Sequence, residues 1–211
     1  MNSPQHPHLP ADEDPGPHSY HHFLGEAVRE LLIEKGVVTA DEIRAGIERM
    51  DARGPHLGAQ VVARAWVDVD YRERLLADGT AAIAELGIAI EPTRLIAVEN
   101  TEQVHNMIVC TLCSCYPRNL LGLPPDWYKS ANYRSRAVNE PRAVLAEFGT
   151  RIPDTVQIRV HDSTADMRYI VLPRRPSGTE GWSELELAKL VTRDAMIGVA
   201  TVTDPSSKRE N

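Results

Sequence analysis

The sequence predicts an α+β fold in which an extended N-terminal helical arm precedes a layered α/β body. Between residues 19 and 87, apolar residues recur at the three- and four-residue spacing of amphipathic helices. From residue 88 onward, short β-rich runs with alternating polarity appear instead. A chain of 211 residues is long enough to bury a substantial core. We therefore expect four segments: a tail (1–18), the helical arm (19–87), the α/β body (88–203) and a second tail (204–211).

The first tail is expected to be disordered. Residues 1–18 contain five prolines, three histidines and three acidic residues, with almost no apolar side chains. His18, His21 and His22 form a cluster that suggests a metal site at first sight. A solvated helix start is the favoured interpretation, because no carboxylate or cysteine accompanies the cluster at ligand spacing.

The arm begins with two predicted amphipathic helices. Gly36 is a plausible stop for the first, and Thr39 with Glu42 has the spacing of a capping box that starts the second. The Gly54-Pro55 pair breaks the chain, and further helices are expected before residue 77. Their ordinary role is packing, either on this chain or on a partner. The apolar positions of the first two helices are Phe23, Leu24, Ala27, Val28, Leu31, Leu32, Ile43, Ile47 and Met50.

The body contains four expected strands. Residues 95–98 and 104–109 are β-rich, and the second run leads directly into a group of cysteines. Residues 156–160 alternate between apolar and polar side chains, which is typical of a strand with one buried face. Residues 169–172 are expected to pair with that strand.

Helices are expected between and after these strands. Residues 126–148 are predicted to be mostly helical, with Pro141 marking a break or a new first turn. Ser183 and Glu186 form a second capping-box pattern, which predicts a helix through Leu187 and Leu190.

The cysteines Cys110, Cys113 and Cys115 are the only ones in the chain and lie within six positions. An odd number at this spacing is a poor disulfide framework, whereas three soft thiolates suit one metal ion. Two sulfurs separated by Ser114 also bring the peptide nitrogens of Ser114 and Cys115 within chelating distance. Deprotonated, these nitrogens would complete a donor set that favours a small trivalent ion and leaves one octahedral position open.

Two plainer interpretations of the cysteines remain open at this point. A zinc site with three cysteines and His105 is possible because His105 lies five residues before Cys110. It is disfavoured because His105 is predicted to lie on a strand and because zinc does not need a serine between two cysteines. Inert buried cysteines are less favoured still.

Charge and hydropathy exclude several classes of protein. The net charge is −7, and no basic cluster is interleaved with aromatic residues, which argues against nucleic acid as a partner. The apolar runs are too short for a membrane span, and no signal peptide is visible. Free thiols without a secretion signal indicate a cytoplasmic protein.

Residues 109–117 (VCTLCSCYP) resemble the metal-binding loop of the nitrile hydratase α subunit, a family that includes the metal-bearing subunit of thiocyanate hydrolase. The resemblance covers roughly residues 20–200 and makes the expected fold nitrile hydratase α-subunit-like. Its most specific part is the cysteine loop with the Pro-Pro-x-Trp-Tyr run that follows it. Further matching segments are residues 121–130, 133–136, 140–142, 144–149, 168–173 and 178–182.

The resemblance implies hydration of a nitrile to an amide by a cobalt-dependent hydro-lyase with one Co(III) per chain. Thr111 between the first two cysteines is typical of the cobalt members, whereas serine there is typical of the iron members, so iron(III) is the alternative. The implied metal ligands are Cys110, Cys113, Ser114 and Cys115. Cys113 is implied to become a sulfinate and Cys115 a sulfenate, which attacks the nitrile or acts as a base. Ser114 would orient these oxygens, and Cys110 would remain a thiolate.

The pocket and the partners are also implied by the resemblance. Arg118 and Trp127 are candidate substrate-pocket residues. Arg118-Asn119 replaces the Trp-Pro of many nitrile hydratases, and an arginine here is shared with the thiocyanate-hydrolysing branch. This departure points to a bulky polar nitrile or to thiocyanate, while a solvent or interface position for Arg118 is at least as plausible.

The implied partners are a β-type subunit, which can be split into two chains and which contributes arginines to the site, and a cobalt-loading accessory protein. In the family, the helical arm embraces that other subunit. Neither nucleic acid nor a membrane is expected as a partner. A non-catalytic metal-thiolate protein and an inactive α-like subunit are the alternatives outside the enzyme class.

Overall fold

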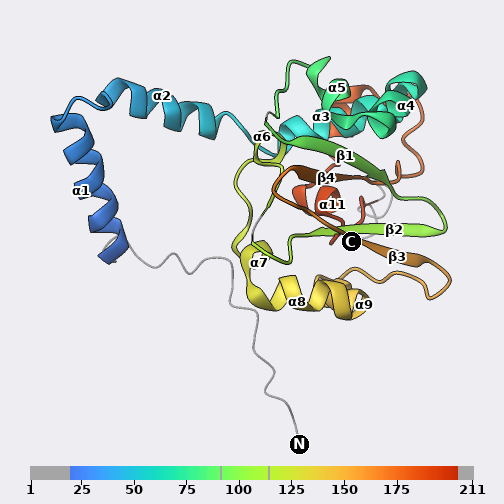
Figure 1. Ribbon diagram of the computed structural model, residues 1–211. Coiled ribbons are helices and arrows are strands. Elements are labelled where there is room, and N and C mark those ends of the chain that lie inside the picture. The colour runs from blue at the N-terminus through green and yellow to red at the C-terminus, as the bar shows by residue number, and fades with distance from the viewer. Residues whose placement is uncertain (1–19, 91, 114, 204–211) are drawn as a thin grey trace, which may run out of the picture. The chain divides into compact units, whose positions relative to one another are not determined.

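A computed structural model describes residues 20–90, 92–113 and 115–203, so both predicted tails lie outside the described residues. The chain divides into two compact units. One comprises the chain up to Ala52 together with Pro125–Trp127, and the other comprises the remainder. The described residues of the second unit form two short parallel sheets with helices packed around them (Figure 1), which confirms the predicted α+β class.

The first unit contains α1 (Tyr20–Glu34) and α2 (Ala40–Asp51). The predicted capping box is confirmed: the Thr39 hydroxyl accepts from the Glu42 amide at 3.1 Å, and the Thr39 amide donates to the Glu42 carboxylate at 2.8 Å. Neither helix contains a buried residue, and apolar side chains such as Phe23 and Ile47 are exposed. These uncovered apolar faces are consistent with a partner-binding arm, which remains a prediction.

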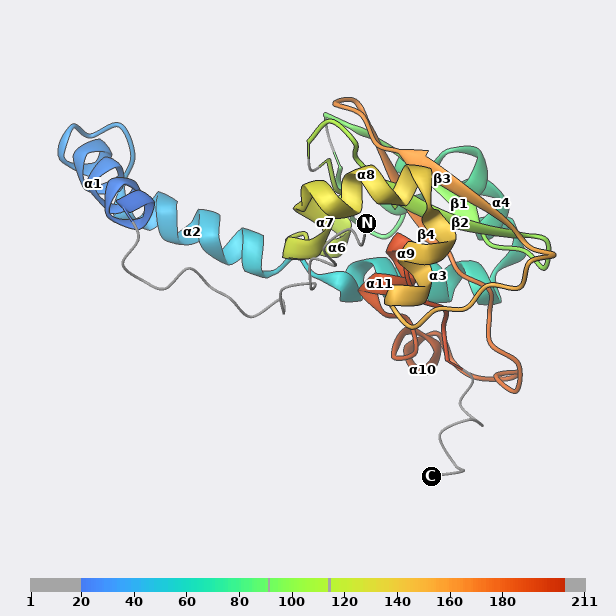
Figure 2. The same ribbon diagram turned by 90° about the horizontal axis from the view of Figure 1, so that it is seen from below.

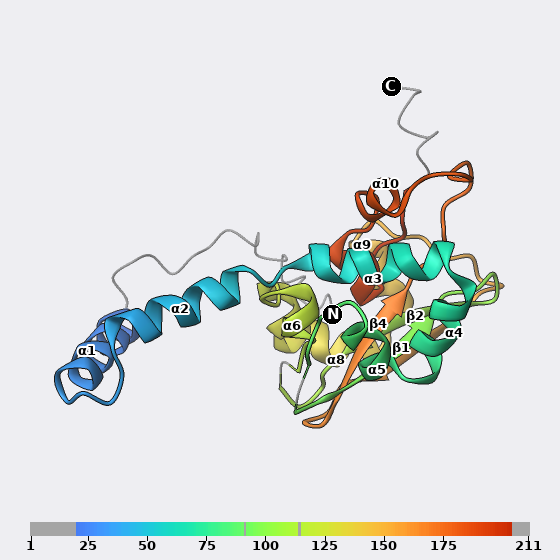
Figure 3. The same cartoon turned by 90° about the horizontal axis from the view of Figure 1, so that it is seen from above.

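The second unit begins with three helices: α3 (Pro55–Val67), α4 (Val69–Ala77) and α5 (Gly79–Ala84). Helices α4 and α5 pack on the strands, and α3 packs on α4. Helix α3 buries Val61, Val62 and Ala65, and α10 (Glu184–Ala188) lies beside it (Figure 3). The helices of residues 19–87 therefore belong to two different units. The division comes after Ala52, because α3–α5 share one unit with the sheets.

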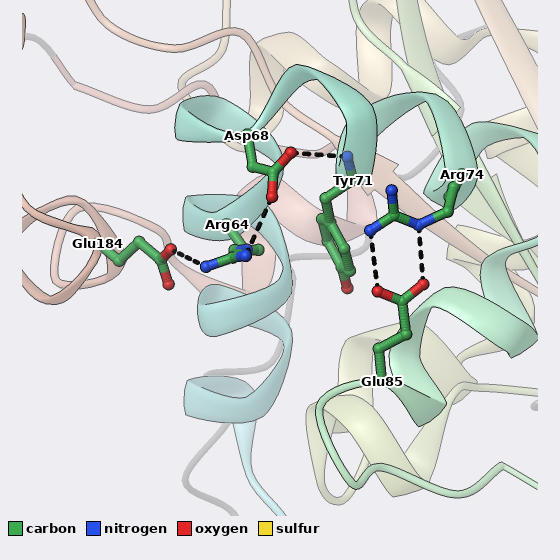
Figure 4. Close-up of polar contacts among 6 residues, drawn as sticks. All are labelled: Arg64, Asp68, Tyr71, Arg74, Glu85 and Glu184. Atoms are coloured by element: carbon green, nitrogen blue, oxygen red, sulfur yellow. Dashed lines mark hydrogen bonds and ion pairs between the residues drawn. The ribbon is translucent and has the colours of Figure 1, made fainter.

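Ion pairs connect the helices of this layer (Figure 4). Arg64 of α3 contacts Glu184 at 2.9 Å and Asp68 at 3.0 Å, which links α3 to α10 and to the start of α4. Arg74 of α4 contacts Glu85 through two bonds of 2.9 Å. These pairs are largely exposed to solvent, so each contributes little to stability by itself.

The strands form two parallel pairs. Strand β1 (Arg94–Glu99) pairs with β4 (Met167–Leu172), and β2 (Val104–Val109) pairs with β3 (Gln157–Asp162). Both predicted runs before the cysteines are thus confirmed as strands.

The predicted pairing of residues 169–172 with β3 is wrong, since Tyr169 lies opposite Ile96 of β1. The ends of the connection between β3 and β4 are already bonded to the other strands: the Ser163 amide donates to Val109 O, and Asp166 O accepts from the Arg94 amide, both at 2.8 Å. The chain therefore crosses from one sheet to the other instead of forming a hairpin.

The remaining helices complete the second unit. They include α8 (Ala131–Asn139), which packs on β2, and α9 (Pro141–Glu147), which packs on β3 (Figure 2). Pro141 occupies the first turn of α9, as predicted. Among the described residues, no helix is both long and apolar enough to cross a membrane. The short helices of this unit are α6 (Arg118–Leu121) and α11 (Arg193–Ile197). Helix α7 (Asp126–Lys129) contains residues of both units.

Candidate metal centre

The three cysteines converge at the end of β2. Cys110 follows the last residue of that strand and is fully buried, whereas Cys115 is half-buried and Cys113 is exposed. The Cys113 sulfur lies 3.4 Å from that of Cys110 and 3.2 Å from that of Cys115. All three sulfurs lie within 4.8 Å of one another. One ion could therefore contact all three without a large movement of the loop.

A carboxylate of the neighbouring strand fixes the start of the cysteine loop, residues 109–117. Asp162 ends β3 opposite Val109. Its two oxygens accept from Thr111, one from the amide at 2.9 Å and the other from the hydroxyl at 2.5 Å. The parallel pairing of β2 with β3 thus determines where the loop leaves the sheet.

Two buried tyrosines donate hydrogen bonds to the backbone of the cysteine loop and of the strand that precedes it. Tyr128 donates its hydroxyl proton to Cys115 O at 2.9 Å, and Tyr133 donates to Ile108 O at 2.7 Å. Burial raises the pKa of both hydroxyls above their usual value, so both remain protonated donors at neutral pH. Arg134 adds a longer bond of 3.3 Å to Thr111 O.

The electrostatics of the loop fit a bound cation. Burial and the hydrogen bonds with the Cys113 and Cys110 sulfurs raise the pKa of Cys115 to about 12, and the positive charge of Arg168 partly opposes this rise. The Cys115 thiol therefore resists ionisation by itself. A bound metal ion would favour its thiolate form, so the loop fits a metal site. The predicted contribution of Ser114 falls on a residue outside the described ranges.

His105 does not complete a zinc site in this structure. His105 lies on β2 and its ring is buried. Its Nε2 donates to Gly198 O at 2.8 Å, and its Nδ1 accepts from the side-chain Nδ2 of Asn100 at 3.4 Å. Five residues along an extended strand place it roughly 16 Å from Cys110. Both ring nitrogens are used elsewhere, so the predicted zinc alternative is wrong. His21 and His22 lie exposed on α1.

A cavity of about 410 Å³ opens beside the sulfurs. Cys113 and Cys115 line it, and Arg118 also lines it. Trp127 is half-buried on α7 and is not among the described residues that line this cavity. The other described lining residues are Ile90, Pro92, Thr93, Tyr116, Pro117, Asn119 and Arg168.

Arg168 is a site residue that sequence reasoning did not identify. It belongs to a segment that resembles the family, but nothing in its neighbourhood suggests a site. It reaches the cavity because β4 pairs with β1, whose preceding residues Pro92 and Thr93 form part of the same wall.

Removal of the Asp162 carboxylate should loosen the cysteine loop. We expect Asp162→Ala to lower the free energy of unfolding by about 1 kcal/mol, because exposed hydrogen bonds to a charged group contribute modestly. The Thr111 amide should exchange with solvent several-fold faster, which hydrogen exchange with mass spectrometry measures. Asp154→Ala, which removes a 98% exposed carboxylate, is the control. Equal exchange at Thr111 in both variants would show that Asp162 does not hold the loop.

Comparison with known proteins agrees with this geometry. The family model described as nitrile hydratase, alpha chain, matches residues 19–200. The chain is 53% identical to a cobalt-containing nitrile hydratase subunit alpha of Pseudonocardia thermophila, covering 82% of this chain and 87% of the relative. It is 46% identical to the thiocyanate hydrolase subunit gamma of Thiobacillus thioparus, covering 84% and 78% respectively.

A solved structure shares the fold. It is a double mutant of the Fe-type nitrile hydratase from Comamonas testosteroni Ni1, with a TM-score of 0.83 and 41% identity over 88% of this chain and 91% of that one. The match extends over nearly all described residues and includes the cysteine loop. The chain therefore belongs to the nitrile hydratase α-chain family.

Proposed function

We propose that the chain is the metal-bearing α subunit of a nitrile hydratase, which converts a nitrile to the corresponding amide. The observation that carries the proposal is the cluster of three sulfurs at the end of β2, two of which line a cavity. A binding or storage protein would need the cluster but not the cavity beside it. The cavity volume is within the range of small-molecule sites.

Cobalt(III), one ion per chain, is the proposed metal, with iron(III) as the alternative. Similarity to cobalt-containing relatives supports cobalt, and similarity to an Fe-type enzyme keeps iron open. The sulfurs of Cys110, Cys113 and Cys115 would hold the ion together with the peptide nitrogens of Ser114 and Cys115. A trivalent ion bound there would acidify water and polarise a nitrile.

The side chains of the chain have distinct proposed roles. Cys110 is fully buried, which protects it from oxidation and suits an unmodified thiolate. Cys113 and Cys115 face the cavity, where oxygen has access, so they are the candidates for oxidation to sulfinate and sulfenate. A sulfenate oxygen on Cys115 would accept a proton from water or attack the nitrile carbon directly. Ser114 would orient these oxygens.

The proposed partners follow from the same family relation. A β-type subunit, in one chain or two, would cover the exposed apolar faces of α1 and α2. A cobalt-loading accessory protein would deliver the ion. A cytoplasmic location, without a nucleic acid or membrane partner, remains part of the proposal.

The test is co-expression with the partner subunit in medium with ample cobalt. We expect about one cobalt per chain, a mass increase that corresponds to oxygen atoms on Cys113 and Cys115, and amide formation from a nitrile. Stoichiometric zinc in tetrahedral geometry would refute the proposal. Metal without any turnover of nitriles or thiocyanate would instead support a non-catalytic metal-thiolate protein.

Hydrolysis of thiocyanate is the second candidate function, because Arg118 lines the cavity. Arg118→Ala should reduce thiocyanate turnover about ten- to a hundredfold, because a charged hydrogen bond contributes roughly 1.5–3 kcal/mol. Small aliphatic nitriles should be converted at unchanged rates. If Arg118 instead binds the substituent of a polar nitrile, the loss should fall on that substrate.

Steady-state assays of wild type and variant with each substrate class measure this difference. Arg159→Ala is the control, because Arg159 is exposed on β3 and is not among the described lining residues. Equal small losses on every substrate would show that Arg118 is a surface or interface residue.

A further inference from the structure

A second cavity lies at the opposite end of β2 from the cysteines. It has a volume of about 540 Å³ and shares no described lining residue with the metal cavity. Asn100 and Glu102, which line it, belong to the turn between β1 and β2, whereas Cys110 follows the last residue of β2 (Figure 1). The six residues of β2 separate these two ends by roughly 20 Å. The second cavity is therefore a site of its own.

Hydrogen bonds hold the walls of this cavity in place. Arg142 donates to Ile152 O at 2.5 Å and to Val156 O at 2.9 Å, and both acceptor residues line the cavity. Arg175 lines it from a different segment and donates to Trp66 O at 3.1 Å. Both segments lie outside the helices and strands, so these bonds replace the regular structure that would otherwise hold them. The cavity is thus largely formed before a ligand binds, as is usual for small-molecule sites.

The inner part of the lining is polar but uncharged. Asn100 and His105 both line the cavity and are only 8% and 4% exposed. Burial lowers the pKa of His105, so its ring is neutral at pH 7. The Asn100 Nδ2 uses one of its two protons in the bond to His105 Nδ1, and its other proton has no acceptor among the described residues. A buried donor therefore remains for a ligand.

The outer part of the lining carries positive charge. Arg151, Arg174 and Arg175 line the cavity with one acidic residue, Glu102, although the whole chain has a net charge of −7. Among the described residues, the exposed Arg151 has neither a hydrogen-bond nor an ion-pair partner. Arg174 contacts Glu102 at 3.1 Å, but these side chains are 58% and 84% exposed, so the pair is weak and another anion can replace it. Glu102 also shows that a carboxylate fits beside Arg174.

We infer that this cavity binds a small organic anion through a carboxylate or phosphate group. Guanidinium groups bind both of these groups through paired hydrogen bonds, and a cleft lined by one sign of charge concentrates ions of the opposite sign. The volume of about 540 Å³ leaves room for an organic part beside the anionic group. This site goes beyond the proposed function, because none of its described lining residues lines the metal cavity.

The first test is a titration of the metal-free full-length chain with inorganic phosphate and with citrate. Proton–nitrogen NMR spectra at constant ionic strength follow the binding, and chloride is the control anion. We expect saturable shifts of the amide signals of Thr101, Arg151 and Ser177, with a Kd for citrate about tenfold below that for phosphate. Equal Kd values for the two probes would indicate an adventitious ion only. Equal shifts with chloride, or shifts confined to residues of the metal cavity, would also overturn the inference.

Two substitutions within the cavity should have opposite effects on the Kd for citrate. Arg151→Gln removes a donor and a charge, so it should raise the Kd about three- to tenfold. Glu102→Gln removes the competing carboxylate, so it should lower the Kd about threefold. Arg159→Gln and Asp154→Asn make the same charge changes at exposed residues that are not among the described lining residues, and they should change the Kd less than about twofold. Equal effects within each matched pair would show that only the net charge matters.

An acidic side chain of a partner subunit is the other source of such a carboxylate. The citrate-dependent rise in the Tm of the complex with the β-type subunit distinguishes the two sources, since a ligand of the folded state raises the Tm. If a free anion is the ligand, citrate should stabilise the complex, and Arg151→Gln should reduce this effect. If citrate binds the free chain but does not stabilise the complex, a partner group fills the cavity and the inference is wrong. Metal content and nitrile turnover should be the same in Arg151→Gln and wild type, so a failure of the proposed function leaves these tests valid.

Discussion

Cys113→Ala should abolish stoichiometric metal binding. The Cys113 sulfur is the central one of the cluster, at 3.4 Å from the Cys110 sulfur and 3.2 Å from the Cys115 sulfur. Its removal therefore leaves only two sulfur donors for the metal. We expect metal affinity to fall by on the order of a hundredfold or more, since loss of groups that only orient a ligand already costs ten- to a hundredfold. Metal content by elemental analysis and the absorption spectrum of the complex measure the effect.

The control for this prediction is a neighbour without a ligand atom. Leu112 is 87% exposed within the same loop, so Leu112→Ala should retain the metal. Cys113 is also exposed, and the metal-free Cys113→Ala chain should unfold at the same urea concentration as the metal-free wild type. One equivalent of metal with an unchanged spectrum in Cys113→Ala would contradict the assignment of this sulfur as a ligand.

Gly198→Ala should destabilise the protein more than any other glycine substitution that we propose. Gly198 caps α11 with φ of +88°, and an added Cβ would lie 2.1 Å from Asn106 O and 2.9 Å from the Met107 Cα. Both contacts are with the backbone of β2, so neither can be relieved by rotating a side chain. We expect a loss of about 3 kcal/mol or more in the free energy of unfolding, measured by urea denaturation.

Gly149→Ala separates the two causes of this loss. Gly149 has a similar φ of +78°, but an added Cβ there would meet nothing within 4 Å. This variant should therefore lose only the conformational cost of about 1 kcal/mol. Because β2 carries Cys110, the Gly198 variant should also take up less metal, whereas the Gly149 variant should not. Equal destabilisation of the two variants would show that the contact with β2 does not matter.

Short-range signals in the sequence predicted the local structure well. The capping boxes at Thr39 and Ser183 are both present, because each needs only a hydroxyl and a carboxylate three residues apart. Pro141 begins a new helix because its fixed φ suits a first turn. In each case, the residues that form the structure are neighbours in the sequence.

Such short-range signals did not predict which strands pair with each other. Alternation identified β3 as a strand with one buried face, but it carries no information about which edge the strand joins. The expected β3–β4 pair was inferred from a short connection, whereas the structure bonds the ends of that connection to β1 and β2. The choice of partner depends on residues about 50 to 75 positions away, whose register is determined only when the whole core packs.

The sequence by itself determined the identity and spacing of the sulfur donors and, through its resemblance, the family. Cys110, Cys113 and Cys115 are close in the chain, so any compact loop brings their sulfurs together. Only the tertiary structure decided what surrounds them: the Asp162 carboxylate on Thr111, the removal of His105 from the site, and the place of Arg168 beside Arg118. The physical reason is that these groups belong to different strands and helices, whose relative positions depend on the parallel pairing of β2 with β3 and of β1 with β4.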